Sequence, residues 1–265
     1  MSDQNLSRRD FVVQSAAAVA LLEPLVLAPG GPAEAADNPP RGSTPQQPLQ
    51  VVCVGAHPDD PESGCGGTLA RYAELGHRVT NIYFTRGEAG ISGKSHDEAA
   101  AIRTAEAETA SKILGAKAVF AGQIDGATEA NHARARSLLA LLAAESPDVL
   151  LAHWPIDTHP DHQVAGILTI RAYLALGRKV PLYFFEVNSG SQTMGFVPTA
   201  YVDITSTREK KKAALFAHKS QNGEAVYREH HEIMENFRGR ELGVSAAEAF
   251  AQLARDHRGG TLPGL

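Results

Sequence analysis

Two short clusters of histidine and aspartate carry the residue types that bind a catalytic metal ion. The first is the run His57-Pro58-Asp59-Asp60, and the second runs from Asp157 to His162, about a hundred residues further on. Neutral imidazoles and carboxylates are ligands that Zn²⁺ prefers, and Fe²⁺ accepts the same set. Three such ligands with one open position form the pattern of a catalytic zinc site. The two clusters together therefore predict a catalytic metal site.

Each cluster directly follows an apolar run that indicates a buried strand. Residues 51–54 lead into the first cluster and residues 148–152 lead into the second. A third run, residues 78–85, ends in the same way at the polar segment 86–90. Strands of α/β sheets present their chemistry at their carboxyl ends, and strand–helix–strand order implies parallel strands. We therefore expect an α/β fold, a Rossmann-like three-layer sandwich with a mostly parallel sheet and an active site at the carboxyl ends of its strands.

The other periodic segments predict the helices that cover this sheet. Residues 97–114 have helical spacing and end at Gly115, a residue type that commonly follows a helix. We expect residues 60–67 to form a Gly-rich loop that packs closely behind the metal, with a helix over 68–75. The further elements expected are helices over 130–145, 163–177, 207–218, 224–240 and 246–255, and strands over 118–120, 181–187 and 202–204.

The motifs in combination resemble those of a known family. Residues 56–60 read Ala-His-Pro-Asp-Asp, residues 159–162 read His-Pro-Asp-His, and residues 85–90 between them read Thr-Arg-Gly-Glu-Ala-Gly. This set resembles the PIG-L/LmbE-like family of zinc-dependent N-acetylglucosaminyl deacetylases over about residues 49–250. Either His/Asp motif alone is a weak signal. The two motifs in this order, each after a predicted strand, form a specific signal for the family.

The resemblance implies a role for each polar residue of the two clusters. The implied metal ligands are His57, Asp60 and His162. The metal would lower the pKa of a water toward ~7 and so supply a nucleophile at neutral pH. Asp59 is implied as the general base, His159 as the acid, the oxyanion stabiliser or both, and Asp161 as the carboxylate that orients His159. The residues alone do not decide which of Asp59 and Asp60 is ligand and which is base.

The resemblance also implies candidates for contact with substrate. Arg103 belongs to an R-x-x-E pattern on the helix predicted over 97–114, so it is a candidate to touch the sugar; the alternative is a surface ion pair with Glu106. Arg86 and Asp157 are the other candidates for substrate binding.

Two further patterns bear on the same region. Residues 218–221 (His-Lys-Ser-Gln) match an H-x-S-Q pattern of the family and imply a position near the rim of the site. The family commonly has an acidic residue directly after HPDD, whereas this chain has Pro61 there and Glu62 next. The role of Glu62 stays open between a partner of the metal ligands and a solvated loop residue.

Composition sets limits on the class of protein. The chain has 265 residues, 43% of them hydrophobic and 21% charged, with a net charge of −5. These values are ordinary for a soluble globular protein and give no reason to expect nucleic acid as a partner. The two cysteines, Cys53 and Cys65, are too few for a disulfide scaffold. The basic run 210–212 is expected on a solvated helix face.

The N-terminus carries the features of an export signal. The run Ser7-Arg8-Arg9-Asp10-Phe11-Val12 resembles a twin-arginine motif, an apolar stretch follows to residue 27, and Ala33-Glu34-Ala35 resembles a cleavage site. We expect a signal peptide over 1–35, a disordered linker over 36–48 and one catalytic domain over 49–265. Glu23 and Pro24 interrupt the apolar stretch, so no stable membrane anchor is expected. The mature chain is then periplasmic or extracellular.

Three functions fit these patterns. The first is a metal-dependent hydrolase that removes an N-acetyl group from a GlcNAc-like sugar or glycoconjugate. The second is an amidase that uses the same metal site on another carboxamide. The third is a sugar-binding protein whose metal holds the ligand without turnover. Asp59 and His159 argue against the third, because binding alone needs neither.

Overall fold

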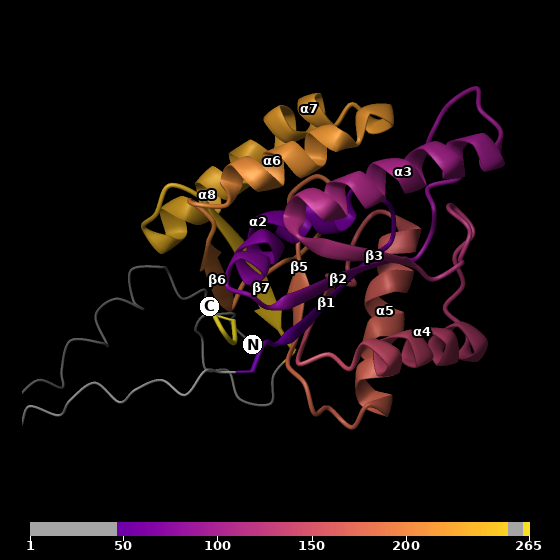
Figure 1. Cartoon of the computed structure of the whole chain (residues 1–265), viewed down its shortest axis with the longest axis horizontal. Coiled ribbons are helices and arrows are strands. Elements are labelled where there is room, and N and C mark those ends of the chain that lie inside the picture. The colour runs from indigo at the N-terminus through magenta and orange to yellow at the C-terminus, as the bar shows by residue number, and fades with distance from the viewer. Residues whose placement is uncertain (1–46, 254–261) are drawn as a thin grey trace, which may run out of the picture. The chain divides into compact units, whose positions relative to one another are not determined.

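The predicted sheet is present, and five of its strands are parallel. The computed structural model describes residues 47–253 and 262–265; the predicted signal peptide and the linker up to residue 46 lie outside the described residues. A seven-stranded sheet has the order β3-β2-β1-β4-β5-β7-β6, and its first five strands run parallel (Figure 1). Its strands are β1 (Gln50–Gly55), β2 (Arg78–Tyr83), β3 (Ala116–Phe120), β4 (Val149–His153), β5 (Leu182–Phe185), β6 (Ala200–Asp203) and β7 (Ala247–Gln252).

Helices cover both faces of this sheet, which gives the predicted three layers. The helices of one layer are α2 (Asp60–Glu74), α3 (His96–Leu114), α6 (Arg208–Ala217) and α8 (Glu232–Leu242) (Figure 1). Those of the other layer are α4 (His132–Glu145) and α5 (Pro160–Ala175). Alternate residues of β1 point to opposite faces, so Cys53 packs in the core under α2 whereas Val52 packs in the core over α4 and α5. A 3₁₀ turn (Lys219–Gln221), α7 (Gly223–Val226) and a π-helical turn (Tyr227–His231) join α6 to α8.

The order of the strands creates a switch point between β1 and β4. From β1 the chain moves outward through β2 to β3, and it then returns to place β4 on the other side of β1. The register pairs Val54 with Ala152, so the carboxyl ends of the two strands lie side by side. Ligands of open α/β sheets bind in the crevice at such a point. Both His/Asp clusters follow these two strands.

The Gly-rich segment is helical, which corrects the predicted loop over 60–67. Helix α2 begins at Asp60, and a kink at Cys65 (φ −149°, ψ 21°) divides it. The glycines do serve close packing: a Cβ on Gly64 would lie 2.3 Å from Phe185, and one on Gly67 would lie 2.7 Å from Ile204. Small residues allow the helix to sit directly on the sheet, so a composition typical of a loop forms a tightly packed helix here.

The expected last helix over 246–255 is also wrong, because Ala247–Gln252 is strand β7. This strand pairs antiparallel with β5 on one side, as in Phe185 with Phe250, and with β6 on the other, as in Tyr201 with Ala249. Alanine favours helices, but a strand that gains backbone hydrogen bonds on both edges and buries its side chains overrides that preference. Strand β6, which overlaps the strand predicted over 202–204, lies at the edge of the sheet.

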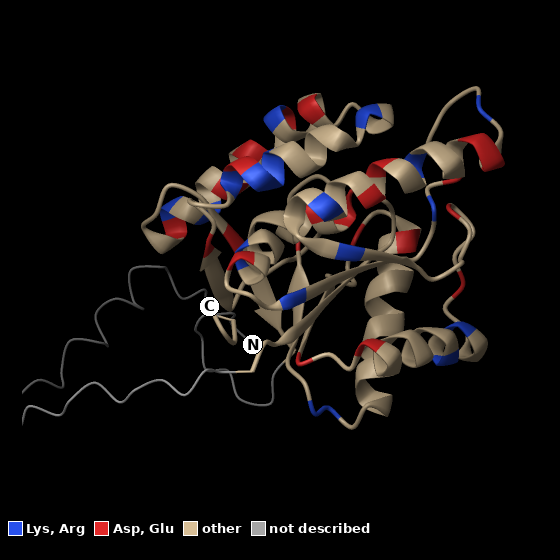
Figure 2. Cartoon of the chain, viewed as in Figure 1, with Lys and Arg blue, Asp and Glu red and all other residues tan. Residues whose placement is uncertain are grey.

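Lys211 is buried, which corrects the solvated face expected for the run 210–212. Its Nζ donates to Glu248 Oε1 at 2.8 Å and lies 3.6 Å from Glu235 Oε2. Glu248 also accepts from the backbone N–H groups of Gly67 and Thr68, at 3.0 and 2.8 Å. It therefore caps the part of α2 that follows the kink. Acidic and basic residues are mixed on the helices that cover this face of the sheet, α3, α6 and α8 (Figure 2).

Two sequence-based expectations concern membranes and cysteines. Within the described ranges, no helix combines the length and apolar composition needed to cross a bilayer. Cys53 and Cys65 are buried free thiols, with 3.4 Å between their Sγ atoms.

Candidate metal centre and active site

A cavity of 540 Å³ opens at the switch point, and both His/Asp clusters line it. His57, Asp59 and Asp60 come from the turn between β1 and α2, whereas His159 and His162 come from the start of α5. The turn is short because Asp60 is already the first residue of α2, so its carboxylate lies beside the end of β1. The structure therefore brings the two clusters together as predicted.

His57 and Asp60 meet across the turn. The backbone N–H of His57 donates to Asp60 Oδ2 at 2.6 Å, and His57 Nδ1 lies 3.3 Å from the same oxygen. Both side chains are more than nine-tenths buried. Burial alone would raise the pKa of Asp60, but the neighbouring His162 and His153 lower that pKa well below its ordinary value. Asp60 is thus held as a carboxylate that faces imidazole nitrogens.

His162 approaches the same carboxylate from the other strand. Its Nε2 lies 3.3 Å from Asp60 Oδ1, and its Nδ1 lies 3.2 Å from Asp157 Oδ1, outside the alignment of a hydrogen bond. Burial opposes a charge on this ring, but Asp60 and Asp157 outweigh burial and raise the pKa of His162 to about 9. The cluster therefore stabilises positive charge, whether a proton or a cation supplies it.

Each of the two imidazoles has a carboxylate behind it. His57 Nε2 donates to Asp161 Oδ2 at 3.0 Å, which leaves Nδ1 to face Asp60. Asp157 lies behind His162, 3.2 Å from Nδ1 but without the alignment of a hydrogen bond, and Nε2 of His162 faces Asp60. A metal-binding histidine nearly always has such a partner on its outer nitrogen, because the partner fixes the tautomer and the ring orientation. The donor set of His57 Nδ1, Asp60 and His162 Nε2 fits a divalent metal such as Zn²⁺.

His153 also lies in this cluster, and the sequence had given it no role. Its Nε2 lies 3.1 Å from Asp60 Oδ2, and its ring stacks on that of His162 with centroids 4.2 Å apart. The same Nε2 accepts the backbone N–H of Ala56 at 3.1 Å, so its lone pair is already engaged. Burial and the adjacent His162 lower the pKa of His153 to about 4. His153 is therefore better described as a neutral ring that supports His162 than as a metal ligand.

Asp59 faces the cavity from a strained backbone conformation. Its φ is 113° and its ψ is −25°, a region that costs a residue with a side chain about 1–3 kcal/mol. The side chain is 28% exposed, and Oδ2 accepts from Arg103 Nη2 at 3.2 Å. Burial raises the pKa of Asp59, and Arg103 opposes the rise. Strain of this kind is concentrated at active sites, where surrounding contacts hold it.

His159 presents a hydrogen-bond donor to the cavity. Its Nδ1 accepts the backbone N–H of Asp161 at 3.2 Å, so in the neutral ring Nε2 carries the proton. Nε2 has no hydrogen-bond partner among residues 47–253 and 262–265, and His159 lines the cavity. Burial and the neighbouring His57 and His162 lower the pKa of His159.

The carboxylate of Asp161 does not contact the ring of His159 as the resemblance implied. Its Oδ2 accepts from His57 Nε2 and from the backbone N–H of Gly126 at 2.7 Å, and its Oδ1 accepts from Thr128 at 2.6 Å. The cause is geometric: Asp161 lies in the first turn of α5, and its side chain points toward the loop that follows β3. Only the backbone of Asp161 orients His159.

Asp157 and Arg86 do not lie where substrate contact was predicted. Asp157 is buried, and its Oδ1 and Oδ2 accept from the backbone N–H of His159 (2.8 Å) and from Thr193 (3.0 Å). Arg86 is exposed outside the lining of the cavity, and its Nε donates to Thr104 at 2.8 Å. Asp157 instead supports the second cluster.

Arg103 does not form the surface ion pair with Glu106 that was considered from the sequence. It is 3% exposed, and its Nη2 donates to Pro58 O at 2.6 Å and to Asp59. The expected partner Glu106 pairs elsewhere, with the backbone N–H of Ser220 at 2.8 Å and its hydroxyl at 2.6 Å. Arg103 borders the cavity: its Nη2 donates to the turn that carries Asp59, its Nη1 lies 3.9 Å from Asp125 Oδ2, and its buried Nε has no hydrogen-bond partner among the described residues.

Asp125 is a residue of the site that sequence reasoning missed. Its Oδ1 lies 3.2 Å from His57 Nε2, and its Oδ2 accepts the backbone N–H of Ala89 at 3.1 Å. It lines the cavity, 3.9 Å from Arg103 Nη1. It belongs to no motif. The one signal that could have found it is its position just after the strand predicted over 118–120.

The segment after α6 forms one wall of the cavity, as the H-x-S-Q pattern implied. His218, Gln221, Val226 and His230 line it, and the last of these lies on the π-helical turn. Glu62 is a buried partner here rather than a solvated loop residue: its Oε1 accepts from Tyr83 at 2.5 Å, and its Oε2 lies 3.6 Å from His218 Nε2.

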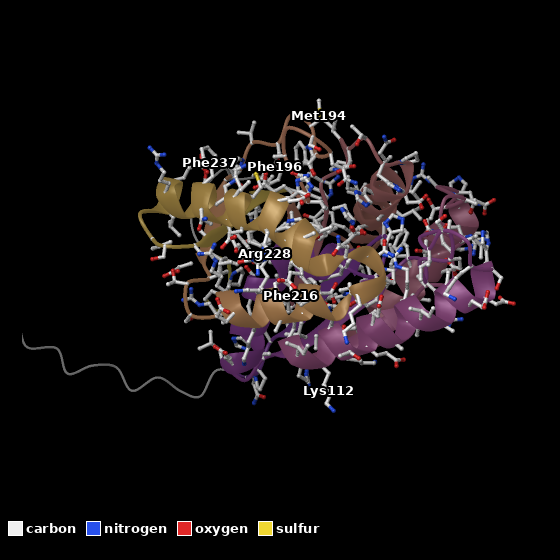
Figure 3. The ribbon with its side chains drawn as sticks, turned by 90° about the horizontal axis from the view of Figure 1, so that it is seen from above. Lys112, Met194, Phe196, Phe216, Arg228 and Phe237 are labelled. Atoms are coloured by element: carbon white, nitrogen blue, oxygen red, sulfur yellow. The ribbon has the colours of Figure 1, made fainter. Side chains whose placement is uncertain are left out.

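The single tryptophan packs into the protein beside the site. Trp154 Nε1 donates to Met194 O at 2.9 Å, and the ring meets Phe184 and Phe196 edge to face. Phe196 and Phe237 lie toward the same margin in Figure 3, and the guanidinium of Arg238 lies over both rings, at 5.8 and 5.3 Å. Trp154 therefore supports the loop after β5 and does not line the cavity.

Comparison with known proteins gives the family. The sequence model of the PIG-L family, described as GlcNAc-PI de-N-acetylase, matches residues 52–173, a span that holds both clusters. The diacetylchitobiose deacetylase of Thermococcus kodakarensis is 31% identical over 194 residues, which cover 67% of this chain and 72% of that protein. The chain belongs to the PIG-L family. The resemblance carried by AHPDD and HPDH is thus confirmed.

Solved structures agree with the PIG-L assignment and with the fold. The N,N′-diacetylchitobiose deacetylase of Pyrococcus horikoshii, in complex with its inhibitor MPG, superposes with a TM-score of 0.68 and 27% identity, covering 77% of this chain and 83% of that one. GalB of Pseudomonas putida KT2440, described as a 4-carboxy-2-hydroxymuconate hydratase, has a TM-score of 0.69 and 24% identity over 78% of this chain and 98% of its own. This second likeness shows the fold alone, and a fold does not determine the reaction.

Proposed function

We propose that this PIG-L protein is a metal-dependent deacetylase that hydrolyses the N-acetyl group of a GlcNAc-containing sugar or glycoconjugate. The observation that carries the proposal is the pair of imidazoles, His57 and His162, each backed by a carboxylate and each turned toward Asp60. Asp59 and His159 stand beside them on the wall of the same cavity.

The donor set of the two clusters fits a divalent metal ion. His57, Asp60 and His162 would hold Zn²⁺, and the same ligands would accept Fe²⁺. When bound, such an ion supplies a Lewis acid that polarises the amide carbonyl and makes a water more acidic.

Two groups of the chain handle the protons and the developing charge. Asp59 accepts the proton of the attacking water, because its carboxylate lines the cavity beside Asp60. His159 Nε2–H donates a hydrogen bond to the carbonyl oxygen as that oxygen gains negative charge, and then to the leaving amine. The accepted proton passes to the amine, so that acetate and a free amino sugar leave.

The remainder of the cavity suits a sugar. Asp125, Asn188, Gln192, Gln221 and His230 all line it, and their side chains donate or accept hydrogen bonds to hydroxyl groups. The relatives support a sugar substrate: among them are diacetylchitobiose deacetylases and 1D-myo-inositol 2-acetamido-2-deoxy-α-D-glucopyranoside deacetylases. Export by the twin-arginine route, with a periplasmic or extracellular site of action, is part of the proposal and rests on residues 1–35.

The test is acetate release from matched substrates. Purified protein is incubated with N-acetylglucosamine, N,N′-diacetylchitobiose and a non-sugar acetamide of similar size, before and after chelation. We expect acetate from at least one of the two sugars, loss of activity on chelation and recovery with Zn²⁺. Turnover of the non-sugar acetamide alone would replace the proposal with the amidase. Sugar binding without acetate release would contradict both the deacetylase and the amidase proposals and favour a sugar-binding protein.

A further inference from the structure

The guanidinium of Arg103 is enclosed directly under the turn that joins β1 to α2. Nη2 donates to Pro58 O at 2.6 Å and to Asp59 Oδ2 at 3.2 Å. The Pro58 oxygen belongs to the peptide group whose nitrogen is that of Asp59. The orientation of this peptide group relative to the rest of Asp59 is the φ angle of Asp59. A donor fixed on that oxygen therefore resists rotation about this angle.

The loop of residues 85–90 makes room for this guanidinium. A Cβ added to Gly87 would lie 2.5 Å from Arg103 Nε, and one added to Gly90 would lie 2.2 Å from Nη1. Either distance is too short for a real carbon atom, so a side chain at these positions would displace Arg103. The Thr-Arg-Gly-Glu-Ala-Gly motif thus has a physical role that does not involve substrate: its two glycines form a cradle for Arg103.

Asp59 needs such support because its backbone is in a conformation that favours glycine. Its φ of 113° is the largest positive value among the non-glycine residues of the described chain. A residue with a side chain stays in this region only where its surroundings hold it. The turn is also tied by two backbone bonds, from Asp60 N to His57 O at 3.2 Å and from Ser63 N to Asp59 O at 2.8 Å. Neither of these acts on the peptide group that precedes Asp59.

We propose that Arg103 is a positioning residue that holds Asp59 in its strained conformation, with the cradle of Gly87 and Gly90 fixing Arg103 in turn. The inference rests on the proposed function for its catalytic meaning, because the residues on either side of the strained position are His57 and Asp60. If Asp59 relaxes, the spacing of these two donors changes as well as the direction of the Asp59 carboxylate. Arg103 then controls the geometry of the metal site through the turn, without being a ligand of the metal.

Zinc affinity separates this role from the two alternatives. Loss of a positive charge near the site favours a bound cation by simple electrostatics, so a purely electrostatic Arg103 predicts tighter zinc in Arg103→Met. A sugar-binding Arg103 predicts unchanged zinc affinity and a raised KM. A positioning Arg103 predicts zinc binding weaker by about 10- to 100-fold, the usual loss when a supporting partner of a metal site is removed.

The experiment measures Zn²⁺ affinity, by competition with a chromophoric chelator, for Arg103→Met alone and combined with Asp59→Gly or Asp59→Ala. Glycine adopts φ 113° without strain, whereas alanine does not. We therefore expect Asp59→Gly to restore zinc affinity to the Arg103→Met protein and Asp59→Ala to leave it weak. Arg71→Met is the matched control, since Arg71 also donates to a backbone carbonyl, Asp203 O at 2.6 Å, away from the cavity. It should bind zinc as the wild type does.

Hydrogen exchange of the metal-free protein gives a readout independent of zinc. In Arg103→Met the amides of Asp60 and Ser63 should lose protection, and the added Asp59→Gly should return it. Arg103→Lys replaces Arg103→Met in both measurements if the latter does not fold. Unchanged or tighter zinc, or equal rescue by glycine and alanine, would overturn the inference. If the wild type binds zinc tightly and Arg103→Met and its rescue by Asp59→Gly behave as expected, but no variant releases acetate, the result would count against the proposed function and leave the inference standing.

Discussion

Replacing Asp59 with asparagine is expected to lower kcat for acetate release by about 10²- to 10⁴-fold, the usual contribution of a general base. Asparagine has nearly the same shape, tolerates positive φ, and offers Arg103 an oxygen in the place of Asp59 Oδ2. It has no basic oxygen that could take the proton of the attacking water. Initial rates of acetate release at saturating sugar, with zinc content measured in parallel, give the comparison.

The control for this variant is Asp97→Asn, a change on the exposed first turn of α3. It should leave both kcat and zinc content as in the wild type. Turnover by Asp59→Asn within roughly tenfold of the wild type, with zinc bound, would show that another group removes the proton.

Replacing His162 with alanine is expected to cost more zinc affinity than removing the carboxylate behind it. Asp157→Asn leaves the imidazole in place but weakens its outer contact, so zinc binding should fall by about 10- to 100-fold. His162→Ala removes one of the three proposed ligands, so its zinc affinity should fall by more than this range. Equilibrium dialysis against buffered zinc measures both variants on one scale.

His132→Ala is the matched control, because His132 is exposed at the start of α4 and distant in sequence from both clusters. It should bind zinc as the wild type does. Equal zinc affinity of His162→Ala and the wild type would exclude His162 as a ligand. A greater loss for Asp157→Asn than for His162→Ala would assign the main contact to Asp157.

The sequence was sufficient to predict that the two His/Asp clusters meet at one site, because the determinants of each cluster are local. The choice of His57, Asp60 and His162 as ligands came from the family resemblance. His57 and Asp60 lie three residues apart on one turn, and the apolar run before them is long enough to identify a strand. His162 joins them because β4 lies next to β1, and parallel strands bring their carboxyl ends to one edge. The same reasoning gave the mostly parallel sheet and the layers of helices.

Contacts that depend on side-chain direction could not be predicted in this way. Asp161 is adjacent to the proposed ligand His162, yet its carboxylate turns to His57, which follows another strand. A surface ion pair between Arg103 and Glu106 was one of the two roles considered for Arg103, but Glu106 pairs with Ser220, more than a hundred residues further along the chain. Such pairings follow from the packing of α3 on the C-terminal segment, which has no local signature.

The errors in secondary structure arose where tertiary packing overrides local preference. Residues 60–67 contain three glycines, which usually indicate a loop, yet Gly64 and Gly67 allow α2 to lie against Phe185 and Ile204. Residues 247–252 contain three alanines, which favour a helix, yet β5 and β6 both pair with them. In both cases the deciding partner is distant in the sequence: the contacts of Gly64 and Gly67 lie more than a hundred residues away, and the strands that pair with β7 lie at least 44 residues away.

The central claim is that His57, Asp60 and His162 form one metal site on which hydrolysis depends. Its most direct test is a titration of metal-free protein with Zn²⁺, with bound zinc and acetate release measured in the same samples. The rate of acetate release should rise in proportion to bound zinc and level off at one zinc per chain. Acetate release by protein that holds no metal, or a rate that does not follow the zinc bound, would contradict the claim.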